Sequence, residues 1–119
     1  MKRNMDLVRL LLLRSEGDKD AEHDCEKFSV QERAYHVQLL IDAGLVEGTA
    51  RRDAKGDFTG AVVSRLTWAG HDFLQSIRDD TLWKKAREHV LKPGASWTFD
   101  ILKEWARHEL RQRLSLPLQ

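Results

Sequence analysis

The sequence predicts an α+β fold that is mainly α, on three observations. Apolar residues recur at helical spacing in several segments, and the clearest of these, residues 29–43, has both a start signal and a stop signal. Two short segments with β-branched residues come next and flank a glycine-containing loop, which predicts one β-hairpin. The amphipathic segments after the hairpin predict further helices, and the last two of them form a C-terminal helical extension.

Length and composition fit one globular domain. Of the 119 residues, 41% are hydrophobic and 33% are charged, a balance typical of soluble rather than disordered chains. We expect a single domain over residues 1–119, with its core in residues 5–80 and its extension in residues 81–114. No segment approaches the ~20 apolar residues of a membrane span. The single Cys25 excludes an internal disulfide, so we expect a cytoplasmic protein with no membrane partner.

The net charge of +1 conceals a strong segregation of charge along the chain. Residues 1–14 carry a net +3 and residues 81–113 a net +4, whereas residues 15–47 carry a net −6. Such asymmetry indicates either a charged partner or attraction between the segments themselves. A nucleic acid would have to contact the basic segments.

The first predicted helix runs from about Met5 to Arg14, with Arg9 and Arg14 on its solvent side. Its buried stripe has helical spacing and consists of Leu7, Val8, Leu10 and Leu11. The acidic residues 15–27 show no apolar period. We therefore predict a loop there, with a short turn of helix at residues 21–25 as its only regular structure.

The helix over residues 29–43 has the best-defined ends. Ser29 is a good N-cap, Glu32 completes a capping box, and Phe28 precedes the cap as a hydrophobic staple. Gly44 is expected to end the helix in a left-handed conformation. The predicted buried face holds four apolar residues, with two more residues at its edge: Val30, Ala34, Val37 and Ile41, then Leu40 and Arg33.

The predicted hairpin has strands at about Leu45–Arg51 and Val62–Thr67, joined by a loop over residues 53–60. Thr67 caps the next helix, roughly Trp68–Arg78, which buries Ala69, Phe73, Leu74 and Ile77.

The two helices of the extension complete the fold. The first starts at a cap on Asp80 or Thr81 and stops at residues 92–94, and the second spans about Thr98–Leu114. Their predicted apolar stripes are Leu82, Trp83, Ala86 and Val90, then Phe99, Ile101, Leu102, Trp105, Ala106 and Leu110. Residues 115–119 are expected to be loose.

A capped helix that ends in Ala-Gly-Leu-Val and leads into a hairpin is typical of the recognition-helix region of winged helix-turn-helix domains. The fold is accordingly predicted to be a winged helix-turn-helix-like domain with one β-hairpin wing.

Three blocks of sequence support this assignment. They are MKRNMDLVR at residues 1–9, AYHVQLLIDAGLV at residues 34–46 and RLTWAGHDFLQSIRDD at residues 65–80, with Trp83 beyond. Together they resemble the domain-of-unknown-function 2513 family of small bacterial and phage proteins. The resemblance covers most of the chain and implies a winged-helix-like fold in a protein of bacterial, phage or prophage origin, without an established activity.

A broader similarity, to arsenic-repressor-type winged helices, rests on HVQLLIDAGLV and on the pattern Leu-Thr-x-x-Gly. The chain departs from that pattern in one place. The helix that usually precedes the recognition helix has no clear counterpart in the acidic residues 15–27.

DNA is one candidate partner. The exposed side of the 29–43 helix is predicted to hold six residues: Gln31, Glu32, Tyr35, Gln38, Leu39 and Asp42. Gln31, Tyr35 and Gln38 could contact base edges or phosphates of double-stranded DNA in the major groove. Glu32 and Asp42 would instead be repelled by the phosphates, so this helix is poorly suited to bind DNA without other parts of the protein.

The wing supplies better phosphate contacts in Arg51, Arg52 and Lys55, although three charges are also normal for a solvated hairpin. A second basic group lies in the C-terminal helices. We interpret it as a solvated helix face rather than a binding stripe: Lys84, Lys85, Arg87, Lys103, Arg107 and Arg111.

The alternative partner is a protein. The acidic residues 15–47 would then form a docking surface, with Tyr35 and Leu39 as its anchors and Asp42 beside them. Homodimerisation through Leu102 and Trp105 of the last helix is compatible with either partner.

Catalysis is not expected. The sequence has no phosphate-binding glycine loop, no Ser-His-Asp signature and no convincing carboxylate pair. His23 and Cys25 are too few for a metal site, and the acidic surroundings of Cys25 disfavour its thiolate. We therefore predict a transcription-regulatory DNA-binding protein or an interaction module, with no enzyme activity, metal or cofactor.

Overall fold

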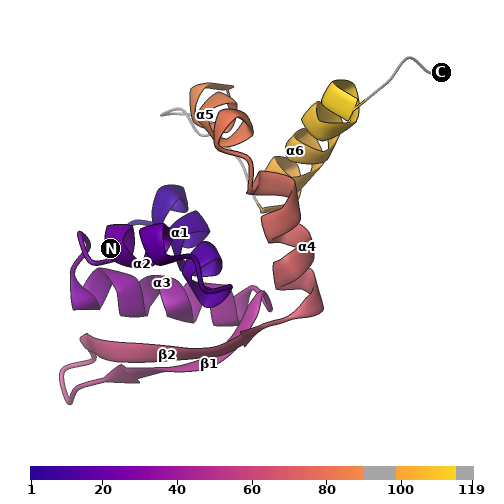
Figure 1. The fold of residues 1–119 in the computed structure, drawn as a ribbon. Coiled ribbons are helices and arrows are strands. Elements are labelled where there is room, and N and C mark those ends of the chain that lie inside the picture. Colours follow the sequence, from indigo (N-terminus) through magenta and orange to yellow (C-terminus); the bar gives the residue numbers. More distant parts are fainter. Residues whose placement is uncertain (90–98, 115–119) are drawn as a thin grey trace. The chain divides into compact units, whose positions relative to one another are not determined.

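The structure, a computed structural model, describes residues 1–89 and 99–114 (Figure 1). Within these residues it contains six α-helices and one two-stranded antiparallel sheet, which confirms the predicted α+β, mainly α class. The chain forms two compact units, Met1–Leu74 and Gln75–Gln119. No helix among the described residues is both long enough and apolar enough to cross a lipid bilayer.

Helix α1, Met5–Ser15, is the central helix of the first unit and contacts α2, α3 and β2. Asn4 caps it by accepting hydrogen bonds from the N–H groups of Asp6 and Leu7. Its buried residues cover a broad face of the helix, opposite Asp6, Leu10 and Arg14: Met5, Leu7, Val8, Arg9, Leu11, Leu12 and Leu13. The prediction that Arg9 faces solvent is wrong, since only 8% of this residue is exposed. Leu10, predicted to be buried, is half-buried.

Helix α2, Lys19–Cys25, contains the short turn of helix predicted at residues 21–25 and starts two residues earlier, so the acidic segment is more helical than predicted. The Asp18 carboxylate accepts a hydrogen bond from the Ala21 N–H over 2.9 Å and starts the helix. Ala21 and Cys25, one turn apart, are buried, while the acidic residues between them are solvated. Only a single turn was predicted because two apolar residues make too short a stripe to stand out among so many charges.

Helix α3, Val30–Asp42, has the predicted start and stop. Ser29 and Glu32 form the reciprocal capping box, and Gly44 has a left-handed φ of 74°. The buried residues are Ala34, His36, Val37 and Leu40. The predicted burial of Val30 and Ile41 is wrong: Val30 is 49% exposed beside an open pocket, and Ile41 is half-buried.

The hairpin consists of β1, Val46–Arg52, and β2, Phe58–Leu66, paired from Val46↔Leu66 to Arg52↔Phe58. Figure 1 shows it running along α3, on the side of α3 away from α1 and α2. Strand β2 starts earlier than predicted. The true turn is shorter than the predicted loop because the Asp53 carboxylate accepts hydrogen bonds from the N–H groups of Lys55 and Asp57 and closes the turn.

Helix α4, Trp68–Ile77, follows the hairpin. Thr67 caps it as predicted, because its hydroxyl oxygen accepts the Gly70 N–H over 3.0 Å. Phe73, Leu74 and Ile77 are buried, but Ala69 is exposed, contrary to the prediction.

The second unit contains α5, Asp80–His89, and α6, Phe99–Leu114, which contact one another. Asp79, one residue before the predicted cap, accepts the Leu82 N–H and starts α5. The buried residues are Leu82, Trp83, Ala86, Leu102 and Ala106. Trp105 and Leu110 are half-buried and Ile101 is exposed, so the predicted α6 stripe was too wide. The expectations for Val90, the Phe99 side chain and residues 92–94, 98 and 115–119 lie outside what the structure describes.

Candidate functional site

The neighbouring cations Arg51 and Arg52 take part in two different arrangements beside α3. Both belong to β1, and the register of the strand pair shifts between them, with Arg51 opposite Gly60 and Arg52 opposite Phe58. Arg52 contacts the ring of Phe58, its cross-strand partner, whereas Arg51 lines a pocket with residues of α1 and α3. Arg51 and Arg52, which were predicted to contact phosphates together, therefore lie in two different surroundings.

Arg52 belongs to a ladder of side chains in contact, Arg52, Phe58, Tyr35 and His36, that joins the hairpin to α3. Its guanidinium carbon lies 4.3 Å from the centroid of the Phe58 ring. The Phe58 ring meets Tyr35 edge-on with centroids 5.8 Å apart, and Tyr35 meets His36 in the same way at 5.3 Å. Tyr35, predicted as a DNA contact or a free anchor, is half-buried and packs inside the fold.

The predicted exposed side of α3 is only partly open. None of its six residues is buried, but only Gln31 and Asp42 are fully exposed. The Gln38 amide donates a 2.8 Å hydrogen bond to the Asp42 carboxylate, and Leu39 is half-buried. The hairpin runs along this helix (Figure 1), and the exposed Asp42 places an acidic side chain at the end of α3.

Lys55 occupies the exposed tip of the hairpin. The Asp53 carboxylate in the same turn is engaged by two backbone N–H groups. On the opposite end of the hairpin, Arg65 and Glu47 form a two-point ion pair at 2.7 and 2.9 Å. The hydrogen bond from Arg65 lowers the pKa of the Glu47 carboxyl. Arg52 and Lys55 therefore lie toward the tip of the hairpin, together with the acidic residues Asp53 and Asp57.

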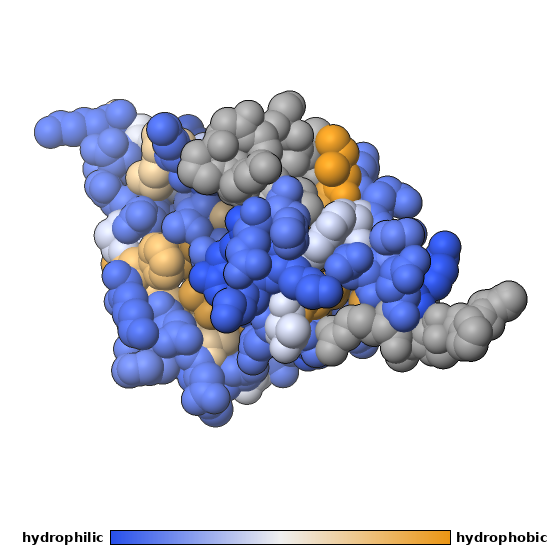
Figure 2. Space-filling model, turned by 90° about the horizontal axis from the view of Figure 1, so that it is seen from above, coloured by the Kyte–Doolittle hydropathy of each residue, from blue (hydrophilic) through white to orange (hydrophobic). Residues whose placement is uncertain are grey.

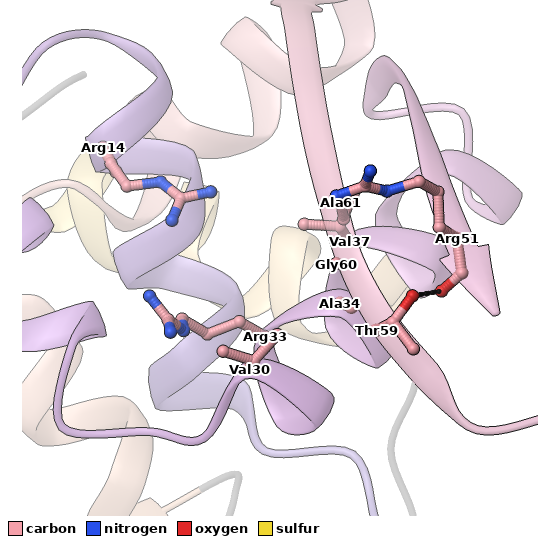
Figure 3. Close-up of a pocket in the computed structure, with 9 residues that line it drawn as sticks. All are labelled: Arg14, Val30, Arg33, Ala34, Val37, Arg51, Thr59, Gly60 and Ala61. Atoms are coloured by element: carbon pink, nitrogen blue, oxygen red, sulfur yellow. Dashed lines mark hydrogen bonds between the residues drawn. The ribbon is translucent and has the colours of Figure 1, made fainter. Parts of the chain in front are cut away.

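A pocket of about 280 Å³ opens between α1, α3 and the hairpin (Figure 3). Arg14 from the end of α1 and Arg33 from α3 lie on one side, and Arg51 of β1 lies on the other. The rest of the lining is small and mainly apolar: Val30, Ala34, Val37, Thr59, Gly60 and Ala61. No carboxylate of residues 1–89 or 99–114 forms an ion pair with these three guanidinium groups.

Sequence reasoning missed this cluster. It assigned Arg14 to solvent and Arg33 to the edge of its helix, and it grouped Arg51 with Arg52. The three arginines come from segments far apart in the chain, so no local spacing could have revealed them. Arg14 and Arg33 also line a second opening of about 520 Å³, where Glu22 and Glu26 of the acidic segment lie.

Two buried titratable groups lie near α3. His36 accepts the Asn4 N–H at Nε2 over 2.7 Å, while its Nδ1 lies 2.7 Å from the Glu32 carbonyl oxygen. This pattern requires the neutral ring with its proton on Nδ1. Burial lowers the pKa of His36, and burial also raises the pKa of the Cys25 thiol, against the opposing effect of Arg14 and Arg33. Among the described residues, no three His, Cys, Asp or Glu side chains cluster as a metal site would require.

The second unit offers a weaker candidate. Lys85 pairs with Glu109 at 3.4 Å, and Arg87, Lys103 and Arg107 also have interactions within the protein. Leu102, one of the predicted dimer anchors, is fully buried within the chain. In the face shown in Figure 2, hydrophobic residues reach the surface only in small separate areas. The first unit therefore holds the better site.

Comparisons with known proteins give a family and no function. The sequence model of the family described as "Hypothetical protein (DUF2513)" matches residues 2–96. An uncharacterized protein of Haemophilus influenzae is 31% identical over 121 residues, covering 97% of this chain and 100% of the relative. No solved structure matches the chain. The chain belongs to the DUF2513 family of hypothetical proteins.

Proposed function

We propose that this protein is a DNA-binding regulator that contacts the phosphate backbone through the tip of its hairpin. The observation that carries the proposal is the ladder of Arg52, Phe58 and Tyr35, which holds a wing cation beside the exposed edge of α3. The order of α1, α2, α3, β1 and β2, with α3 leading into a hairpin, supports a winged-helix-like reading.

The ladder gives Arg52 a defined position. A guanidinium group stacked on an aromatic ring keeps its N–H donors free at the edge, where they can bind phosphate oxygens. Lys55 supplies a second exposed cation at the tip of the hairpin, between Asp53 and Asp57. Phosphate neutralisation by such residues supplies most of non-specific DNA affinity.

Helix α3 is less suited to contact base edges in the major groove of DNA than its position in the sequence suggests. The hairpin lies along it, Gln38 is already bonded to Asp42, and the Asp42 carboxylate would meet phosphates with the wrong charge. We therefore propose binding dominated by the backbone, with a weak preference for sequence and a small contribution from Gln31.

The test is the salt dependence of binding to a labelled generic duplex, measured by fluorescence anisotropy. Affinity should fall steeply from about 50 to about 200 mM salt, and the double variant Arg52→Ala, Lys55→Ala should flatten the logarithmic slope by about 2. Arg65→Ala is the control for the loss of one positive charge from the hairpin, because it removes a cation that Glu47 already neutralises. No binding at about 50 mM salt, or an equal loss in the control, would contradict the proposal.

The alternative, a protein-interaction module anchored by Tyr35 and Leu39, needs a free apolar anchor. The Tyr35 ring packs against Phe58 and His36, and Leu39 is half-buried. These contacts favour a structural role for Tyr35, so DNA remains the proposed partner.

A further inference from the structure

We propose that the pocket between α1, α3 and the hairpin binds a small organic phosphate monoester, with Arg14, Arg33 and Arg51 as its phosphate-binding residues. This inference does not depend on DNA binding. The pocket contains Arg51 and not Arg52, whereas the proposed DNA contact contains Arg52 and not Arg51.

The charge of the pocket is the first argument. Three guanidinium groups from three different elements line one cavity, and none of them has a carboxylate partner in the part of the chain that the structure describes. Like charges in a partly desolvated space repel one another more strongly than in open water. An anion held between them would replace that repulsion with charge-assisted hydrogen bonds.

The donors are available for such a ligand. Arg33 uses only its Nε, which donates to the Ser29 carbonyl oxygen over 3.4 Å, so no hydrogen bond within the described residues engages its two Nη groups. Arg51 lies opposite Gly60 on the neighbouring strand, and its Nη2 atom is 2.8 Å from where a methyl group on Gly60 would lie. Its guanidinium group therefore lies close over Gly60, which also lines the pocket.

The form of the pocket identifies the class of ligand. A volume of about 280 Å³ lies at the small end of ligand cavities and exceeds what a bare phosphate needs. Val30, Ala34 and Val37 form an apolar lining that a bare anion would not use. A phosphate with a small apolar substituent matches both parts of the lining.

Charge also favours a monoester over a diester. A phosphate monoester carries a charge of about −1.5 to −2 at pH 7, against one negative charge for each backbone phosphate of DNA. Three arginines balance the monoester better, and their planar forks suit its oxygens. Glu22 and Glu26 in the neighbouring opening oppose anion binding, which predicts a modest affinity.

The first experiment uses the wild-type protein. Side-chain Nε–H signals of arginine are followed by NMR during titration with phenyl phosphate, inorganic phosphate and sodium chloride at matched ionic strength. We expect saturable shifts of Arg14, Arg33 and Arg51, tighter binding of phenyl phosphate than of inorganic phosphate, and no shift of Arg65. Absence of saturation, or shifts shared equally with Arg52 and Arg65, would overturn the site.

The second experiment uses variants whose folding is checked by circular dichroism. Arg33→Ala and Arg51→Ala should each weaken phenyl phosphate binding about tenfold or more. Lys55→Ala, a matched loss of charge outside the pocket, should leave it unchanged, and Glu22→Gln should strengthen it. Equal weakening by Arg51→Ala and Lys55→Ala would show that only net charge matters and would overturn the proposal.

A third arm separates the pocket from the DNA interface. A short duplex replaces phenyl phosphate in the same NMR titration. If the duplex shifts Arg14 and Arg33 while phenyl phosphate does not, the pocket belongs to the DNA contact and the monoester proposal fails. If phenyl phosphate binds and Arg52→Ala has no effect on duplex affinity, the proposed DNA function fails while the pocket stands.

Discussion

The hydroxyl group of Thr67 donates a 2.6 Å hydrogen bond to the carbonyl oxygen of Gly44. The same hydroxyl accepts the Gly70 N–H over 3.0 Å, and the Thr67 N–H donates to the Leu45 carbonyl oxygen over 3.0 Å. One threonine thereby satisfies the end of α3 and the start of α4. The Ala-Gly-Leu-Val and Leu-Thr-x-x-Gly motifs, separate in sequence, are two halves of one junction.

Replacing Thr67 with valine keeps the shape of the side chain but removes both hydroxyl hydrogen bonds. We expect the free energy of unfolding to fall by about 1–3 kcal/mol, the sum of a lost helix cap and a lost hydrogen bond. Urea unfolding followed by circular dichroism measures this change. Thr49→Val on the exposed side of β1 is the control, and a similar loss there would contradict the junction.

The variant Gly70→Ala tests the same junction through sterics. A methyl group at Gly70 would collide with the carbonyl oxygen of Leu45, which belongs to rigid backbone and also accepts the Thr67 N–H. Although alanine favours helices, we expect a loss of about 1–3 kcal/mol in the free energy of unfolding. Ala69→Ser, at the exposed neighbouring position, should change stability by less than about 0.5 kcal/mol. A stabilised Gly70→Ala protein would refute the close approach.

His36 makes stability depend on pH. Burial lowers its pKa below the ordinary value of 6.5, and its Nε2 must stay unprotonated to accept the Asn4 N–H. Well above pH 6.5 the ring is neutral in both the folded and unfolded states, so it contributes no pH dependence there. As the pH falls below 6.5, the unfolded chain binds a proton that the folded protein does not, and the free energy of unfolding falls.

Urea unfolding between pH 7.5 and pH 5 measures this dependence. His36→Gln should remove much of the slope, because glutamine does not titrate, at the cost of a lower stability at neutral pH. His23→Gln, at an exposed site, should retain the slope. If His36→Gln retains the full slope, another group is responsible.

Cys25 reports the opening of α2. Its thiol is fully buried and burial raises its pKa, so a thiol-specific disulfide reagent should react slowly with the folded protein at pH 8 and rapidly in denaturant. Asp18→Ala removes the cap of α2 and should speed labelling several-fold by favouring local opening. Asp20→Ala, an equal loss of charge outside the cap, should not. Fast labelling of the wild-type protein would argue against the packing of α2.

Local signals predicted several elements well. The capping box of Ser29 and Glu32 and the left-handed Gly44 fix the ends of α3 through interactions within a few residues, which is the range that sequence spacing reports. Of the helix at Lys19–Cys25, only a turn at residues 21–25 was predicted, although its cap, Asp18, is equally local. Its apolar stripe is too short to be recognised without α1, against which it packs.

The sequence by itself determined the secondary structure around α3, the family resemblance and the class of fold, because these depend on neighbours along the chain. The tertiary structure decided which charged and polar side chains are buried and which of them lie together. It buried Arg9 on a central helix, engaged Tyr35 between Phe58 and His36, and separated Arg51 from Arg52. It also brought Arg14 and Arg33 to Arg51 across three elements. Convergence of this kind depends on how helices and strands pack, a property that residue spacing along one chain does not record.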